Sequence, residues 1–226
     1  MYKHFVEHYN DIFTFDESLL EALKGFIKPQ GKAVDLGCGT GRLVSLLDEL
    51  GMKSVGVDLD LDMIKKAQED YPHLSFIHDS MVDFLDTHDT YDLITCFGNT
   101  IAHIDEPLLK QLLMRAKKVL KPQGYLLIQL LNYEKILKEK PKELKKITFK
   151  NGTFERFYTY HEKSITFTTK LTVDSIQSTG STTLYPYTKT QLENILEALG
   201  FQFKFVTDFR SSALDEHAFH LSIIIQ

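Results

Sequence analysis

The sequence predicts an α/β fold: a doubly wound, seven-stranded, mostly parallel sheet with its last strand antiparallel, and an antiparallel β lid inserted after the fifth strand. Two patterns support this prediction. In the first half of the chain, short apolar runs alternate with amphipathic helical segments, which is the order of strand–helix–strand units. In residues 147–185, Thr, Phe, Tyr and Ile are frequent between turn signals, which favours antiparallel strands.

Five strands of the parallel sheet are expected in the first half. Their apolar runs lie at 33–36, 54–57, 74–77, 91–96 and 125–130. Helices are expected between them at 42–50, after Asp60 as N-cap, and around 108–116 with a stop near Lys121-Pro122. The run at 125–130 is nearly all apolar, as expected of a strand buried on both faces.

The pattern changes near Pro141. Turn signals at Asn151-Gly152 and Thr179-Gly180 divide the following stretch into strands. The preceding residues 135–150, in which glutamates alternate with lysines, are expected to form a helix and linker with a solvated face. We expect residues 141–185 to be an insertion, a β-rich segment that covers the substrate.

The main fold resumes after this insertion. Thr188 and Gln191 have the spacing of a capping box, and Gly200 follows the expected end of the helix. Two last strands are expected at 201–206 and 219–225. The main domain therefore comprises residues 1–140 and 186–226.

Composition is typical of a soluble globular protein of 226 residues, with 43% hydrophobic and 25% charged residues. The net charge of -5 does not favour nucleic acid as a partner. Cys38 and Cys96 are far apart and are expected to be reduced thiols of a cytoplasmic protein. Residues 1–13 have no apolar secretory core, no apolar run is long enough for a membrane span, and no spacing suggests a metal site.

A glycine-rich loop joins the first strand directly to a helix. It reads Asp35-Leu36-Gly37-Cys38-Gly39-Thr40-Gly41. Glycines permit backbone angles that other residues avoid and allow a ligand to approach the main chain. The dinucleotide fingerprint G-x-G-x-x-G would place a glycine at position 42, which is Arg42. The loop also opens with Asp35, an acid suited to a cation rather than to a pyrophosphate.

Two further acids follow the next two strands. Asp58 ends the second strand, seventeen residues after Gly41, and a carboxylate there can accept both hydroxyls of a ribose. Asp79 follows the third strand, where it could accept from an adenine amino group. Since parallel sheets bind ligands at the carboxyl ends of their strands, these acids favour an adenosine-containing ligand.

With these residues the sequence resembles the class I, Rossmann-like methyltransferases, whose loop reads D/E-x-G-x-G-x-G and whose cofactor is S-adenosylmethionine. The resemblance covers about residues 30–131, and the last helix and two strands in outline. It implies that the glycines hold the methionine part, that Asp58 binds the ribose and that Leu59 packs on the adenine. The implied cofactor-binding set is Asp35, Gly37, Cys38, Gly39, Gly41, Asp58, Leu59, Asp79, Ser80, Met81 and Phe97.

The loop after the fourth strand, residues 97–104, faces the transferring methyl group in this class. It is similar to the loop of small-molecule N-methyltransferases of the glycine and amino-sugar type. This resemblance makes His103 the candidate base or acceptor-orienting group; alternatively, it caps the helix that begins near Asp105. Tyr9 resembles an N-terminal tyrosine that closes over the cofactor in relatives; alternatively, its ring packs a surface helix.

Candidate substrate-binding residues come from four segments. Asn99 belongs to the loop after the fourth strand, and Asn132 with Tyr133 follows the fifth. Arg156, together with Tyr158 on the inserted strands, could bind an anionic group or form the polar face of an exposed sheet. The link between the last two strands, residues 210–217, returns to the same edge, so that Arg210 or His217 could touch substrate or be exposed to solvent.

The leading hypothesis is S-adenosylmethionine-dependent methyl transfer to nitrogen or oxygen of a small-molecule acceptor by a monomer or homodimer. One alternative is an RNA or protein methyltransferase that uses the basic segment 134–170, which has ten Lys or Arg and five Asp or Glu. Another is a non-catalytic S-adenosylmethionine-binding sensor or subunit. A nicotinamide dehydrogenase is disfavoured by Arg42.

Overall fold

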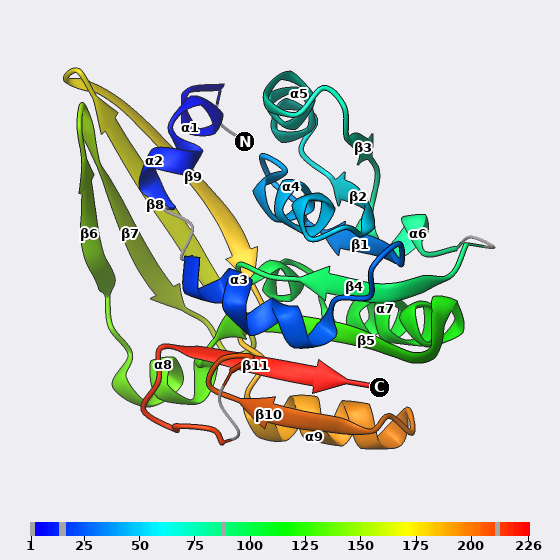
Figure 1. Cartoon of the computed structure of the whole chain (residues 1–226). Helices are drawn as coiled ribbons and strands as arrows, with labels where there is room; N and C mark the ends of the chain where they lie inside the picture. Colours follow the sequence, from blue (N-terminus) through cyan, green and yellow to red (C-terminus); the bar gives the residue numbers. More distant parts are fainter. Residues whose placement is uncertain (1–2, 14–16, 87–88, 211–212) are drawn as a thin grey trace.

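The computed structural model describes residues 3–13, 17–86, 89–210 and 213–226. It contains a seven-stranded and a four-stranded sheet (Figure 1). The strands of the larger sheet are β1 (Lys32–Leu36), β2 (Lys53–Asp58), β3 (Ser75–His78), β4 (Tyr91–Cys96), β5 (Leu120–Leu131), β10 (Phe203–Val206) and β11 (His220–Ile225). The strands of the smaller sheet are β6 (Glu143–Phe149), β7 (Gly152–Tyr160), β8 (Ile165–Val173) and β9 (Ile176–Leu184).

Helices precede and connect these strands. The α-helices are α1 (Lys3–Glu7), α2 (Tyr9–Ile12), α3 (Glu17–Leu23), α4 (Arg42–Glu49), α5 (Leu61–Asp70), α6 (Met81–Phe84), α7 (Glu106–Val119), α8 (Tyr133–Glu139) and α9 (Lys189–Ala198). Two 3-10 helices, η1 (Lys24–Phe26) and η2 (Thr100–His103), complete the described part of the chain. No helix within the described ranges is both long enough and apolar enough to cross a lipid bilayer.

The larger sheet has the strand order β10-β11-β5-β4-β1-β2-β3. Strands β1 to β5 pair in parallel, and β11 runs antiparallel to both of its neighbours, β5 and β10. This confirms the predicted doubly wound sheet with its antiparallel last strand.

Alternating side chains of the central strands bury both faces of this sheet. Ile94 and Ile128 belong to a core that includes α7 and α9, whereas Leu93 and Leu127 pack with α3 and α4 on the other face. Helices on both faces explain why these strands are apolar at successive positions.

Local capping determines where two helices begin. The Asp60 side chain accepts hydrogen bonds from the N–H groups of Asp62 and Met63 at the start of α5. Thr188 and Gln191 form the predicted reciprocal capping box of α9, which replaces lost backbone partners at the helix start. These capping predictions are confirmed.

The four-stranded sheet has the order β6-β7-β8-β9, and Asn151-Gly152 lies at its first hairpin as predicted. The predicted turn at Thr179-Gly180 is wrong, because Gly180 lies within β9 and pairs with Thr169. The chain turns instead at Asp174 and Ser175, with φ of 46° and 69°. Two adjacent positive φ angles match the twist of a tight hairpin, and Asp is among the residues that tolerate them.

The expected helix and linker over residues 135–150 is only partly correct. Helix α8 ends at Glu139, and residues 143–149 form β6, an edge strand. Lysines suit an exposed edge strand because charge there prevents pairing with another chain. The four-stranded sheet lies between β5 and α9 in sequence, while the division into a main domain and an inserted lid stays a prediction.

Candidate active site

The glycine loop and the loops after β2, β3 and β4 emerge at one edge of the larger sheet. The parallel register brings them together: Leu36 pairs with Val57, and Asp58 pairs with His78. The N–H groups of Gly37 and Cys38 donate to the Val57 carbonyl at 2.7 and 3.0 Å, which fixes the start of the glycine loop.

Three glycines give the loop its shape. Gly37, Gly39 and Gly41 have φ of 76°, 53° and 82°, a region that L side chains rarely adopt. A Cβ atom at Gly37 would lie 2.4 Å from Cγ2 of Thr100. The loop therefore presents main chain, rather than side chains, at the sheet edge.

Asp58 links β2 to this loop. Its Oδ2 accepts the N–H of Gly39 at 2.8 Å, and its Oδ1 accepts the N–H of Asp60 at 2.9 Å. Burial raises the pKa of Asp58, although the hydrogen bonds from the backbone oppose that shift. The carboxylate is thus held at the place where the resemblance implies a ribose.

Asp35 is buried beneath the loop. Its Oδ1 accepts the hydroxyl of Thr95 at 2.8 Å. Burial, assisted by the charge of Asp58, raises the pKa of Asp35 to about 7 despite the bond from Thr95. A cation bound beside this group would favour its ionised form.

Leu59 follows Asp58 and is 71% exposed. Its carbonyl lies 3.0 Å from Nε2 of His78. An exposed leucine on its own is common in proteins, but here it adjoins the strand-end acids. It can therefore offer an apolar contact to a flat ring held at Asp58.

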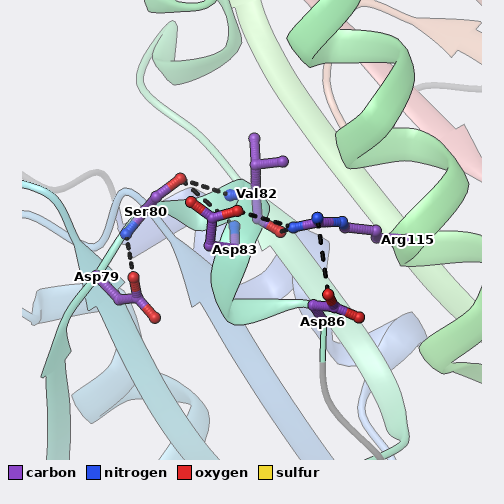
Figure 2. Close-up of polar contacts among 6 residues, drawn as sticks. All are labelled: Asp79, Ser80, Val82, Asp83, Asp86 and Arg115. Atoms are coloured by element: carbon purple, nitrogen blue, oxygen red, sulfur yellow. Dashed lines mark hydrogen bonds and ion pairs between the residues drawn. The ribbon is translucent and has the colours of Figure 1, made fainter.

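The loop after β3 is held by its own capping bonds (Figure 2). Oδ1 of Asp79 accepts the N–H of Ser80 at 2.7 Å. The Ser80 hydroxyl accepts the N–H groups of Val82 and Asp83 in the first turn of α6, which begins at Met81. Arg115 of α7 donates to the Val82 carbonyl at 2.7 Å and pairs with Asp83. The second carboxylate oxygen of Asp79 makes no hydrogen bond within the described part of the chain.

Tyr9 of α2 lies over the glycine loop. Its ring carbons are 3.6–3.7 Å from the place of a Cβ at Gly39. The neighbouring Asn10 accepts the Thr40 hydroxyl at 2.8 Å, which ties α2 to the loop. Burial, together with the charges of Asp58 and Asp35, raises the pKa of Tyr9 to about 12, so that its hydroxyl stays protonated.

The N-terminal helices also touch the four-stranded sheet. The rings of Phe5 and Phe13, which both pack on Tyr9, lie 5.4 and 5.7 Å from the ring of Phe154 on β7. Figure 1 shows α1 and α2 between this sheet and helix α5. They thus connect the glycine loop to β7.

The loop after β4 begins with Phe97, whose ring stacks on Phe209 at 5.0 Å. It ends with η2 and His103, which is exposed. No hydrogen bond joins the His103 side chain to another described residue, and Asp105, not His103, caps α7. Partial desolvation lowers the pKa of His103 below its ordinary value of 6.5, which favours the neutral imidazole.

Asn99, Asn132 and Tyr133 come together, but their polar groups bind one another and the backbone. The Asn99 amide donates to the Tyr133 hydroxyl at 2.9 Å and accepts the N–H of Leu131 at 3.2 Å. Asn132 donates to the carbonyls of Glu216 and Ala218 and caps α8. Tyr133 is fully buried. The geometry supports a positioning role, and substrate binding by these residues stays a prediction.

Arg156 and Tyr158 lie on the same face of β7, turned toward the body of the protein. Tyr158 is 5% exposed, which removes the alternative that it belongs to an exposed polar face. Arg210 pairs with Asp208 at 3.5 Å and is exposed, as is His217. Exposure to solvent, the alternative to substrate contact, therefore agrees with the positions of Arg210 and His217. Residues 211–212 of the link between them lie outside the residues that the structure describes.

Three contributors to the site were missed by the sequence analysis. Thr95 donates to Asp35, and the pair Asn10–Thr40 joins α2 to the glycine loop. A hydroxyl inside the apolar strand Tyr91–Cys96 was the available signal for Thr95. Nothing in the local pattern indicates the contact between Asn10 and Thr40, since thirty residues separate them.

The sheet order, with a glycine loop and acids at successive strand ends, is that of the α/β methyltransferase fold. Residues 33–124 match the family model described as "Methyltransferase domain", so this part of the chain is a methyltransferase domain.

Two curated relatives match part of the chain. Glycine/sarcosine N-methyltransferase of Halorhodospira halochloris is 30% identical over 144 residues, which cover 59% of this chain and 54% of that protein. Ubiquinone biosynthesis O-methyltransferase of Actinobacillus pleuropneumoniae is 28% identical over 110 residues, which cover 45% of this chain and 46% of that protein. The chain thus spans about half the length of these relatives.

A solved structure is similar over the whole chain. An S-adenosylmethionine-dependent methyltransferase from Clostridium acetobutylicum has a TM-score of 0.86 with 15% identity, covering 100% of this chain and 98% of that chain. At that identity the likeness concerns the fold, including its four-stranded addition.

Proposed function

We propose that this protein transfers a methyl group from S-adenosylmethionine to a nitrogen or oxygen atom of a small-molecule acceptor. The observation that carries this proposal is the bond between Gly39 and Asp58, which joins a main-chain loop to a carboxylate at the end of the next strand. A loop whose glycines expose the main chain, next to an acid, suits a ligand with a zwitterionic chain and a ribose.

The residues present fit this cofactor. Asp58 would hold the ribose, Leu59 would contact the adenine, and Asp79, with Ser80 and Met81, would bound the adenine pocket. The glycine loop would hold the methionine part, with Cys38 and Phe97 beside it. Asp35 lies where its ionised carboxylate would stabilise a cation, and its pKa of about 7 allows ionisation near neutral pH.

When bound, this cofactor supplies a methyl group on a sulfonium, which is already activated for displacement. The chain then has to align the acceptor at about 3 Å from that carbon and exclude water. The neutral imidazole of His103 would accept a proton from the acceptor or orient the acceptor. The lowered pKa of His103 favours this neutral form. Tyr9, over the glycine loop, would exclude water from the site.

The two curated relatives support a small acceptor and both atom types, since one is named as an N-methyltransferase and the other as an O-methyltransferase. We place the protein in the cytoplasm as a monomer or homodimer. The two free, buried cysteines, Cys38 and Cys96, support a reducing compartment.

A two-part experiment tests this function. Calorimetric titration with S-adenosylhomocysteine should show binding to one site per chain. Incubation with a methyl-labelled donor and a panel of small amines and alcohols should then label at least one of them. Absence of binding, label found only in RNA or protein, or binding without transfer to any panel member would contradict the proposal.

A further inference from the structure

The inner face of the four-stranded sheet is the face directed toward the body of the protein. Register places three cross-strand pairs of β7 and β8 on it, and these are Phe154–Leu171, Arg156–Thr169 and Tyr158–Phe167. Phe154 and Leu171 are buried, as is Tyr158. A polar pair thus lies between two rows with large apolar side chains.

Two buried polar atoms on this face lack a hydrogen-bond partner among the described residues. They are Nε of Arg156 and the hydroxyl of Tyr158, which are two residues apart on β7. Buried polar groups in native proteins are almost always bonded, so each such atom calls for an explanation. Both are donors, and both are therefore available to an acceptor atom of a ligand.

Among the residues that the structure describes, the guanidinium of Arg156 makes one hydrogen bond. Its Nη2 donates to the Lys145 carbonyl at 2.7 Å, and its Cζ lies 6.0 Å from the centre of the Phe154 ring. No ion pair joins Arg156 to an acidic residue in the part of the chain that the structure describes. A partly buried guanidinium without an acid nearby is stabilised by a bound anion.

The position of the pair relates it to the proposed active site. At one end of the face, Phe154 contacts Phe5 and Phe13, which pack on Tyr9. At the other end, beyond β9, the N–H of Tyr185 donates to the Ala102 carbonyl at 2.7 Å, next to His103. Arg156 and Tyr158 thus lie on β7, in a sheet whose two ends contact the segments that carry Tyr9 and His103.

We propose that Arg156 and Tyr158 bind a carboxylate group of the methyl acceptor, which makes the acceptor a small carboxylic acid such as an amino acid. Nε–H and O–H supply two donors for the two oxygens, and the guanidinium supplies the opposite charge. This inference rests on the proposed function, because it names the acceptor class of the same site.

Binding of acetate, the smallest carboxylate probe, tests the inference. Protein saturated with S-adenosylhomocysteine is titrated with acetate and, separately, with acetamide, its neutral isostere, and binding is followed by ligand-observed NMR. Acetate should bind and acetamide should bind at least about tenfold more weakly. Arg156→Gln should weaken acetate binding about tenfold or more, and Tyr158→Phe should weaken it about threefold or more.

Arg210→Gln is the matched control, since Arg210 is an exposed arginine paired with Asp208. It should leave acetate binding unchanged. If Arg156→Gln does not fold, Tyr158→Phe decides, because it removes only a hydroxyl group.

The outcomes separate the two proposals. Binding of S-adenosylhomocysteine without a preference for acetate over acetamide, or with unchanged acetate binding in both variants, overturns the carboxylate site alone. Failure of the wild type to bind S-adenosylhomocysteine overturns the proposed function and this inference together.

Discussion

Asp58 and Gly39 are joined by a hydrogen bond of 2.8 Å between the carboxylate at the end of β2 and the main chain of the glycine loop. The same carboxylate also accepts the N–H of Asp60. One side chain therefore sets the shape of the loop and supplies the negative charge at its rim.

Replacement of the Asp58 side chain should weaken cofactor binding more than it destabilises the fold. Asp58→Ala removes bonds to a charged group, each contributing about 1.5–3 kcal/mol, and should weaken S-adenosylhomocysteine binding roughly tenfold to hundredfold in calorimetry. Asp60→Ala is the control, since it removes the N-cap of α5 and should lower stability by about 1 kcal/mol with little change in affinity. Equal affinities of wild type and Asp58→Ala would exclude the ribose assignment.

Asp35 should make cofactor affinity depend on pH. Its pKa is raised from 3.8 to about 7 in the ligand-free protein, so below pH 7 it holds a proton that a cationic ligand must displace. Affinity should therefore rise with pH up to about 7 and then level off. Asp35→Asn should flatten this profile, whereas a profile unchanged in that variant would show that another group titrates.

The same raised pKa has a consequence for stability. Between pH 3.8 and about 7, the folded ligand-free protein keeps a proton on Asp35 that the unfolded chain releases. Its contribution therefore makes the free energy of unfolding fall as pH rises through this window. Wild type should lose more stability than Asp35→Asn in denaturant titrations between these pH values; equal changes would contradict burial of this acid.

His103 should affect turnover and not cofactor binding. A general base contributes about 10²–10⁴-fold to rate, so His103→Ala should lower kcat by that order with unchanged affinity for S-adenosylhomocysteine. The neutral imidazole is the active form, and since its pKa lies below 6.5, wild-type kcat should rise with pH below that value. His73→Ala, at an exposed residue of the opposite sheet edge, should behave as wild type. An unchanged kcat in His103→Ala would exclude a role as base and indicate that this histidine is structural.

Asn132 should affect stability rather than acceptor affinity. Its amide bonds two carbonyls of the link before β11 and caps α8, and the residue is buried. Asn132→Ala should cost about 2 kcal/mol and lower Tm by several degrees, with KM for the acceptor unchanged. A raised KM with unchanged Tm would instead support substrate binding.

The elements at the strand ends could be predicted because their signals are local. Glycines 37, 39 and 41 and the acids Asp35 and Asp58 lie directly after apolar runs, and the parallel topology brings them to one edge. Capping by Asp60 and Thr188 was predictable for the same reason, since each motif spans one helical turn.

Contacts between distant segments could not be predicted. The bond between Asn10 and Thr40, the packing of Phe5 on Phe154, and the pair Arg156–Thr169 depend on tertiary packing and register. Thr179-Gly180 was predicted as a turn because Gly is common there, yet it pairs within β9, where register with β8 outweighs local preference.

A crystal structure with S-adenosylhomocysteine bound would show whether the glycine loop and Asp58 hold the cofactor. The ribose should lie at Asp58, the adenine against Leu59, and the sulfur toward the loop that carries His103, with Arg156 and Tyr158 lining the space beyond it. S-adenosylhomocysteine held elsewhere, or a glycine loop that makes no contact with it at saturating concentration, would contradict this assignment of the cofactor site.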